Sequence, residues 1–295
     1  MTPWQALQQR CLEVEQSPHD QACASPCMSV CVMKTDADEC WGCLRTLDEV
    51  AHWSIYTPAE QRGVWHRLSP THSTALPTSL SMRQLTFYLD FISPYAYLAF
   101  HALPKTLQGL TYQVSYQPIL FGAVLQHHGQ LGPAEIEGKR AWTYRQVLWL
   151  AQQQACPLRM PASHPFNPVS LLRLALACDV QGLPNHHQCE QLFQHVWGEG
   201  LEASDLQRLA DLQARLAPVR DAQSDEVKTQ LRQVTQAAVD KGVFGVPTIL
   251  VDDKLFWGQD ALPMLRAYLQ GEAWFDGPDW QACSVLPKTL ERKRP

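Results

Sequence analysis

From residue 82 onward, a strand, a helix and a second strand follow one another, and this order constrains the fold more than any other feature. The segment "RQLTFYLDF" (83–91) alternates and then runs apolar, as a buried strand does. Residues 94–107 have helical spacing with proline in the first turn, and "LTYQVSYQPIL" (110–120) has the pattern of a second strand. A β–α–β unit predicts two parallel strands joined by a right-handed crossover.

A long, mostly helical stretch separates this unit from a second one further along the chain. Helical spacing recurs in five segments, at 141–154, 167–180, 186–200, 203–216 and 224–242. "VPTILVDDKLFWG" (246–258) then predicts a hairpin, and "ALPMLRAYLQ" (261–270) a closing helix. The resulting βαβ…ββα order predicts an α/β, thioredoxin-like domain with a large helical insertion at about 122–242.

Composition divides the chain into three zones. Residues 1–68 hold a cysteine-rich module, 69–81 have the Ser/Thr/Pro composition of a linker, and 82–295 form the thioredoxin-like domain. The net charge of −5 argues against a nucleic-acid partner. No run reaches the roughly 20 apolar residues of a membrane helix, and the start of the chain lacks a signal-peptide pattern. We therefore expect a cytoplasmic protein with reduced thiols and no membrane partner.

Ser93 and Pro94 occupy the corner between the first strand and the first helix. In a thioredoxin-like domain the reactive group lies at this corner, because the unpaired N–H groups and the dipole of the helix favour an anion. No cysteine follows Ser93 within three residues, so dithiol exchange is not expected here. Ser93 is either the N-cap of the helix or a hydrogen-bond donor to the thiolate of a bound ligand, and one serine can do both.

A second motif, "VFGVPT" (243–248), lies just before the predicted hairpin. In thioredoxin-like proteins a proline at this point follows a cis peptide bond and faces the reactive corner. The backbone of Val246 would then be free to pair with an extended peptide, and a tripeptide thiol is a natural guest. The alternative for Pro247 is an ordinary proline at the entry of a strand.

Five segments together resemble the 2-hydroxychromene-2-carboxylate isomerases, which share a superfamily with kappa-class glutathione transferases and periplasmic disulfide oxidoreductases. These segments are "FYLDFISPYAYLAF", "HPFNPVSLLRLAL", "VWGEGL", "VFGVPT" and "LFWGQDALPML". The resemblance covers about 82–272 and implies that glutathione lies with its sulfur beside Ser93. It further implies that Val246 and Pro247 contact the cysteinyl unit, and that Asp260, with Gln259, contacts the γ-glutamyl end. The alternative for Asp260 is a helix N-cap.

Other candidate positions include departures from the pattern of this family. Gln130, in "HHGQLGP", stands where many relatives carry an asparagine that touches glutathione, and Ala261 stands where relatives often carry arginine. Asn167, in "HPFNP", either belongs to the glutathione site or caps the following helix. His164 has no partner visible in the sequence, and we expect a structural role for it.

The reaction implied by the resemblance belongs to aromatic catabolism and converts 2-hydroxychromene-2-carboxylate into trans-o-hydroxybenzylidenepyruvate. The glutathione thiolate adds to the conjugated aromatic pyruvate, the bond rotates, and glutathione is eliminated. Lys139, Arg140 and Tyr144 are candidates for the substrate carboxylate or the enolate, against the alternative of a solvated helix start. Rival functions are a kappa-type glutathione transferase and a non-enzymatic glutathione- or thiol-binding redox adaptor. A homodimer is an open alternative to a monomer.

Five of the ten cysteines lie between residues 23 and 43. Four of them form two pairs around a short loop, namely Cys27, Cys31, Cys40 and Cys43. Four thiolates suit an iron–sulfur cluster or zinc, and thiols without metal are the alternative. Residues 25–68 resemble small bacterial modules predicted to bind iron–sulfur, with Cys23 as an extra cysteine. Capping signals at Thr46 and Thr57 predict two short helices packed by tryptophans.

Overall fold

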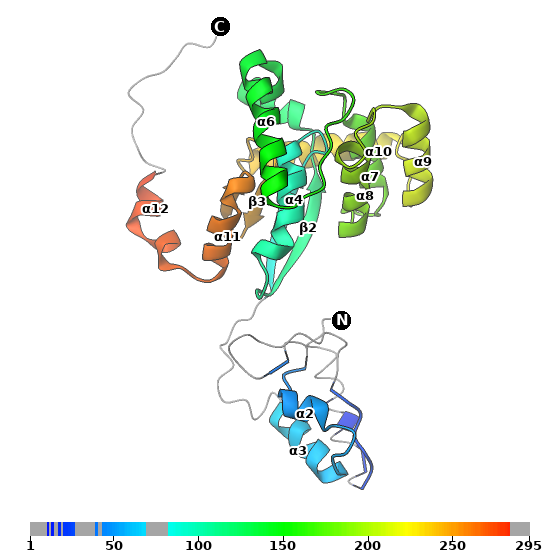
Figure 1. Ribbon diagram of the computed structural model, residues 1–295, viewed down its shortest axis with the longest axis vertical. Coiled ribbons are helices and arrows are strands. Elements are labelled where there is room, and N and C mark those ends of the chain that lie inside the picture. The colour runs from blue at the N-terminus through cyan, green and yellow to red at the C-terminus, as the bar shows by residue number, and fades with distance from the viewer. Residues whose placement is uncertain are drawn as a thin grey trace. The chain divides into compact units, whose positions relative to one another are not determined.

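A computed structural model describes residues 11, 13, 14, 17, 18, 20–26, 39, 40, 43–68 and 82–283 (Figure 1). Contacts divide the chain into two units, Met1–Ser81 and Met82–Pro295, and each is described by itself. The predicted linker at 69–81 lies outside the described residues. None of the described helices is long and apolar enough to cross a membrane.

The larger unit is built on one sheet with the strand order β2-β1-β3-β4. Its strands are β1 (Arg83–Leu89), β2 (Tyr112–Pro118), β3 (Thr248–Val251) and β4 (Lys254–Trp257). β1 and β2 run parallel, whereas β3 pairs antiparallel with both β1 and β4. The predicted parallel unit and the predicted hairpin are both confirmed, and the fold is thioredoxin-like.

Two helices belong to the frame of the sheet, and six form the insertion. α4 (Pro94–Thr106) connects β1 to β2, and α11 (Leu262–Leu269) follows β4. The insertion consists of α5 (Phe121–His128), α6 (Glu137–Gln153), α7 (Val169–Ala177), α8 (His186–Trp197), α9 (Leu206–Leu216) and α10 (Asp225–Asp240). The unit ends with α12 (Pro278–Cys283). The predicted helices are confirmed, and α6 begins four residues before the predicted start.

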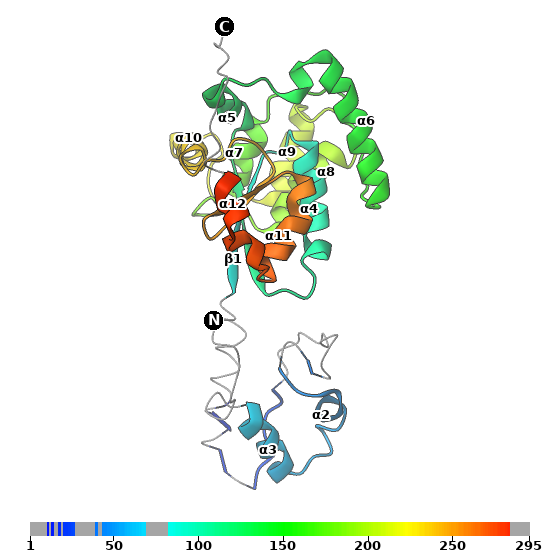
Figure 2. The ribbon, with the colours of Figure 1, turned by 90° about the vertical axis from the view of Figure 1, so that its left-hand side faces the viewer.

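The helices lie on opposite sides of the sheet (Figures 1 and 2). α4 packs beside α11, α6 and α8, whereas α10 packs beside α5, α7 and β2. An aromatic cluster joins the sheet to the insertion: the ring of Phe193 lies 4.9 Å from that of Phe91 and 5.2 Å from that of Phe100. Trp197 is fully buried and donates from Nε1 to the Phe91 carbonyl at 2.9 Å. The insertion therefore holds the end of β1 directly before the corner.

The smaller unit contains α2 (Leu47–Ala51) and α3 (Pro58–Leu68). Thr46 and Glu49 form a capping box at the start of α2, and Thr57 makes the equivalent bonds with Glu60 at the start of α3. Trp65 is buried in a small apolar cluster that also includes the partly buried Trp53. The prediction of two short helices packed by tryptophans is confirmed.

Candidate functional site

Ser93 lies at the N-terminal end of α4 and is buried. Its Oγ accepts a hydrogen bond from the backbone N–H of Ala96 at 3.2 Å, so the serine caps the helix. The same hydroxyl donates to the backbone carbonyl of Val246 at 3.4 Å. This second contact is close to the upper limit for a hydrogen bond, so a stronger acceptor such as an anion would take the hydroxyl proton in its place.

Val246 and Pro247 lie on the loop that leads from α10 into β3, and their peptide bond is cis, as expected from the sequence. Val246 is 6% exposed, and none of the described residues accepts a hydrogen bond from its N–H. The Pro247 carbonyl accepts from the Gly258 N–H at 2.9 Å, which fixes the loop against the end of β4. A backbone N–H without a partner in a nearly buried residue suits an extended peptide guest, because buried N–H groups are almost always paired in native structures.

Gln259 and Asp260 lie in a short 3₁₀ turn, η2 (Gln259–Ala261), directly after Gly258. Gly258 has φ of 98°, and a Cβ at this position would lie 2.3 Å from Oδ1 of Asp260. Only glycine therefore lets this carboxylate fold back over the turn. The N-cap of α11 is Ala261, so Asp260 is not the helix cap that the sequence left as an alternative. Asp260 is exposed, and no described cation is ion-paired with it.

Asp260 lies close to Tyr95, which belongs to the first turn of α4, and so lies near the corner. Burial raises the pKa of the Tyr95 phenol, and the negative charge of Asp260 raises it further. The hydroxyl donates to Oε1 of Gln146 on α6 at 2.7 Å. The start of α4, the η2 turn and the insertion thus approach one another beside Ser93.

Asp90 is a buried carboxyl group that the sequence analysis did not select. Oδ1 accepts from the Ile92 N–H at 3.1 Å, and Oδ2 accepts from the Phe121 N–H at 2.9 Å, so one side chain joins the loop before α4 to the start of α5. Its backbone carbonyl accepts from the Ser93 N–H at 3.0 Å. Burial raises the pKa of Asp90 to about 7, although hydrogen bonds from backbone N–H groups oppose the rise. An aspartate at the end of an apolar strand was the available sequence signal.

His164 has the partners that the sequence did not reveal. Its Nε2 lies 2.9 Å from the carbonyl oxygen of Ile92, the residue before Ser93. Its Nδ1 lies 2.7 Å from the hydroxyl of Tyr144, which accepts from Nε of Arg140 at 3.2 Å. A polar chain therefore runs from the first turns of α6 to the corner, whereas Lys139 is exposed beside it.

Gln130 and Asn167 have exposed side chains. The Gln130 backbone N–H donates to the Leu125 carbonyl at 2.9 Å and so closes the end of α5. Oδ1 of Asn167 accepts from the N–H of Val169, the first residue of α7, at 3.1 Å. This bond forms a side-chain turn just before α7, whose N-cap is Pro168, so Asn167 is not the helix cap that the sequence left as an alternative. No hydrogen bond within the described chain joins either residue to Ser93.

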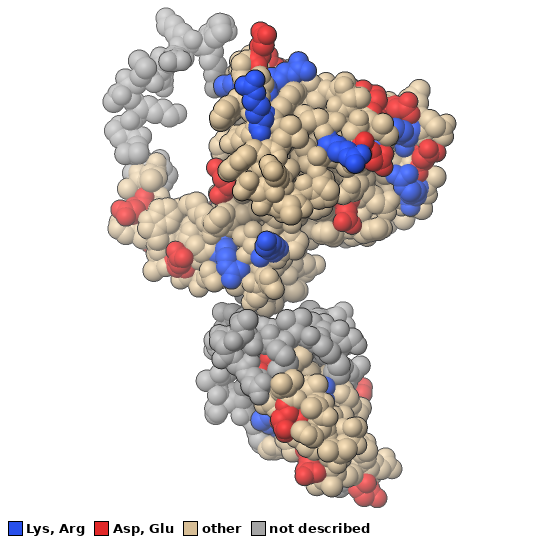
Figure 3. Space-filling model, in the orientation of Figure 1, with Lys and Arg blue, Asp and Glu red and all other residues tan. Residues whose placement is uncertain are grey.

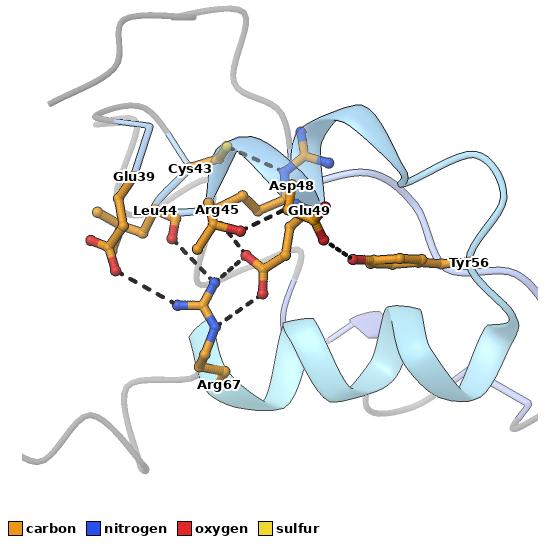
Figure 4. Close-up of polar contacts among 9 residues, drawn as sticks. Glu39, Cys43, Leu44, Arg45, Asp48, Glu49, Tyr56 and Arg67 are labelled. Atoms are coloured by element: carbon orange, nitrogen blue, oxygen red, sulfur yellow. Dashed lines mark hydrogen bonds and ion pairs between the residues drawn. The ribbon is translucent and has the colours of Figure 1, made fainter. Parts of the chain in front are cut away.

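A cysteine turn in the smaller unit is a second candidate site. Cys40 and Cys43 are buried at 3% and 1% exposure, and the Leu44 N–H donates to the Cys40 carbonyl at 2.8 Å, which closes the turn. Nε of the buried Arg45 donates to Sγ of Cys43 at 3.4 Å. Arg67 reaches from α3 to the Leu44 carbonyl and holds the turn against the helices (Figure 4).

These features fit half of a four-thiolate site. An N–H group directed at sulfur is the kind of contact that tunes a metal-bound or cluster-bound thiolate. Two of the predicted ligands, Cys27 and Cys31, lie outside the described residues. Among the residues with a described position, no group of three or more His, Cys, Asp or Glu side chains is arranged to hold a metal ion.

Two family models match the chain, one over each unit. A family described as DSBA-like thioredoxin domain matches residues 84–270. A family described as protein of unknown function (DUF1289) matches residues 25–71, which include the four cysteines. The first match covers more than half of the chain.

Individual proteins extend these matches. A 2-hydroxychromene-2-carboxylate isomerase from Pseudomonas putida is 32% identical over 190 residues, which are 61% of this chain and 91% of the relative. Glutathione S-transferase kappa 1 from Rattus norvegicus is 26% identical over 72% of this chain and 97% of the relative. A solved 2-hydroxychromene-2-carboxylate isomerase superposes with a TM-score of 0.56 at 25% identity, covering 67% of this chain and 98% of that structure. Since the chain is 32% identical to a relative of which it covers 91%, and the DSBA-like family model matches more than half of the chain, this chain belongs to the 2-hydroxychromene-2-carboxylate isomerase family of DSBA-like thioredoxin-domain proteins.

Proposed function

We propose that this protein is a glutathione-dependent isomerase of the 2-hydroxychromene-2-carboxylate type. The observation that carries the proposal is the pairing of the Ser93 hydroxyl with the Val246 carbonyl, beside a Val246 N–H that has no described acceptor. The corner offers no thiol, so a thiol must come from a ligand.

The residues around the corner suit glutathione in kind and in charge. The unpaired Val246 N–H would pair with the backbone of the cysteinyl unit. The unpaired Asp260 carboxylate, with Gln259, would hold the γ-glutamyl ammonium group, and Gln130 would add a hydrogen bond from its exposed amide. When bound, glutathione supplies a nucleophilic thiolate for reversible addition to a conjugated aromatic pyruvate.

The protein's own contribution is to hold that sulfur as an anion and to orient it. Ser93 would transfer its hydrogen bond from the Val246 carbonyl to the sulfur, because a thiolate is the stronger acceptor. The N-terminal end of α4 would add the favourable field of its dipole. Both effects lower the pKa of a thiol bound at this corner, and a lower pKa raises the thiolate fraction near neutral pH.

The experiment compares two cap serines. Ser93→Ala and Ser224→Ala each remove a helix N-cap, since Ser224 caps α10 in the same way, so both should lose about 1 kcal/mol of stability. We expect isomerisation to require glutathione and to fall about 100-fold in Ser93→Ala alone, the size of loss seen when one preorganised donor is removed. Activity that is indifferent to both glutathione and Ser93 would refute the proposal.

Two rival functions correspond to other outcomes of the same assay. Tight glutathione binding without isomerisation, but with conjugation of a chlorodinitrobenzene electrophile, would favour a kappa-type transferase. Tight binding with neither activity would favour a redox adaptor.

For the smaller unit, we propose that residues 1–68 form a metal-binding module in which Cys27, Cys31, Cys40 and Cys43 hold an iron–sulfur cluster or zinc. The buried pair of cysteines with an N–H donor directed at one sulfur supports this proposal. Elemental analysis and the absorption spectrum of anaerobically purified protein test it. Cys40→Ser should lose the metal, whereas Cys283→Ser, at an exposed cysteine of α12, should retain it. A colourless protein that contains zinc would exclude the cluster, and a metal-free protein would refute the module.

A further inference from the structure

Arg140 carries a guanidinium group that is fixed in place but has no acidic partner. Its Nε donates to the Tyr144 hydroxyl at 3.2 Å, and its Nη2 donates to the His164 carbonyl at 3.0 Å. Its Cζ also lies 5.6 Å from the centre of the Tyr144 ring. The side chain is exposed, and no carboxylate of the described residues is ion-paired with it. Because these bonds already order the side chain, an incoming anion meets a preorganised donor.

The chain of contacts from Arg140 ends at the corner that holds Ser93. A carbonyl oxygen can only accept, so Nε2 of His164 carries the proton in its 2.9 Å contact with Ile92. Burial lowers the pKa of His164, and this favours the neutral ring. The Tyr144 hydroxyl lies 2.7 Å from the His164 Nδ1 and 3.0 Å from the His164 carbonyl oxygen, two acceptors that share its one proton. His164 and Tyr144 therefore fix the position of Arg140 relative to Ile92, which directly precedes Ser93.

The field of the α6 dipole at Arg140 favours an anion, and no described carboxylate is ion-paired with the guanidinium. Arg140 lies in the first turns of the seventeen-residue helix α6, at the positive end of its dipole. The carboxylate of Glu135 accepts from the Gly132 N–H at 3.0 Å, whereas that of Glu137, in the first turn of α6, is exposed and is not ion-paired with Arg140. Basic and acidic side chains both lie at the end of the larger unit where α6 begins (Figure 3). The free face of the guanidinium presents N–H groups that suit the two oxygens of a carboxylate.

We propose that Arg140 binds the carboxylate of an aromatic 2-oxo acid substrate, with Tyr144 and His164 as positioning residues. This inference rests on the proposed isomerase function, because it assigns the acidic end of the substrate to a group linked to that same corner. The aromatic part of the substrate then extends from Arg140 toward the Ser93 corner.

The first test is a binding measurement without glutathione. The probe is trans-benzylidenepyruvate, compared by calorimetry with its uncharged methyl ester. We expect Arg140→Gln to bind the acid about tenfold more weakly and the ester as the wild type does, since one charge-assisted pair is lost. The matched control is Arg145→Gln, which removes an exposed arginine from the same helix and should change neither affinity. Equal affinities of Arg140→Gln and wild type for the acid would overturn the proposal.

The second test addresses positioning. Tyr144→Phe keeps the ring but cannot accept a hydrogen bond from Arg140. The ratio of the affinities for the acid and the ester should therefore fall about threefold. Partial unfolding would weaken the binding of both probes and leave this ratio unchanged. An unchanged preference in Tyr144→Phe would refute its positioning role.

Kinetics separate this inference from the proposed function. With 2-hydroxychromene-2-carboxylate and glutathione, Arg140→Gln should raise KM and leave kcat nearly unchanged. A wild type that binds the acid through Arg140 but does not isomerise would refute the proposed function and leave the carboxylate subsite standing. A wild type that isomerises, with an Arg140→Gln variant of unchanged KM, would refute the subsite and leave the proposed function standing.

Discussion

Replacement of Asp90 by asparagine should remove a pH dependence of stability that the wild-type protein carries below neutral pH. The Asp90 carboxyl is fully buried at the end of β1, where its two oxygens accept from Ile92 and Phe121. Burial penalises the charged form, and the pKa of the folded state accordingly rises from 3.8 to about 7. Folding therefore changes the affinity of this one group for a proton.

The sign and the size follow from linkage. Between pH 3.8 and about 7 the folded protein keeps a proton that the unfolded chain has released, so stability falls as the pH rises through this interval. The contribution is fully present below about pH 4 and is lost above about pH 7. Each pH unit is worth about 1.4 kcal/mol, so the whole interval corresponds to about 4 kcal/mol. Asparagine does not titrate, so it adds no pH dependence to the stability. Its amide NH₂ group meets one of the two backbone N–H donors, and this mismatch costs about 1–3 kcal/mol of stability at every pH.

The assay is urea unfolding of wild type and Asp90→Asn, followed by far-ultraviolet circular dichroism at pH 5 and pH 8. Other titrating groups contribute equally to both proteins, so the difference in free energy of unfolding isolates Asp90. We expect the free energy of unfolding of the wild type, relative to that of Asp90→Asn, to fall by about 3 kcal/mol from pH 5 to pH 8. Asp211→Asn, at an exposed aspartate of α9, should keep the wild-type pH dependence. A difference that is constant with pH would mean that the backbone N–H bonds outweigh burial and that the reasoning is wrong.

Three further substitutions test how the site is held. Trp197→Phe deletes the donor to the Phe91 carbonyl and should lower the free energy of unfolding in urea by about 2 kcal/mol; a loss below about 0.5 kcal/mol would contradict an anchoring bond. Asn185→Ala removes the capping box of α8 and should cost about 1 kcal/mol in the same titration. Gly258→Ala places a methyl group where Oδ1 of Asp260 lies, so calorimetry should show glutathione binding weakened about fivefold or more, and unchanged binding would exclude Asp260 from that site.

The parts of the fold that were predictable are those in which local pattern and tertiary packing agree. α10 has apolar residues at helical spacing and a serine cap, and the sequence places it within two residues at either end. The start of α6 was not predictable, because "EGKR" is polar throughout and contains glycine. α5 was not resolved as a separate helix, because its eight residues are too short for periodicity to distinguish a helix from a strand.

The residues of the candidate site also divide into those that a local pattern predicts and those that only tertiary packing brings together. Ser93 and Val246 are predictable because each lies in a short motif with its own local geometry. The contact between Tyr144 and His164 was not predictable, because the two residues are twenty positions apart and no periodicity relates a helix turn to a loop. Asp90 lies in the segment directly before Ser93, but no local pattern shows that its carboxyl accepts from the Phe121 N–H thirty-one residues away.

These contacts between distant parts of the sequence indicate how the chain contributes to catalysis. Three segments meet at the corner, and a polar group holds each: Asp90 joins it to α5, the Ser93 hydroxyl joins it to the loop of Val246, and His164 joins it to the insertion. If glutathione supplies the reactive sulfur, the protein's task is to keep donors and charges fixed around it. Loosening any one of the three ties should then lower the rate through misplacement, even though only Ser93 would touch the sulfur.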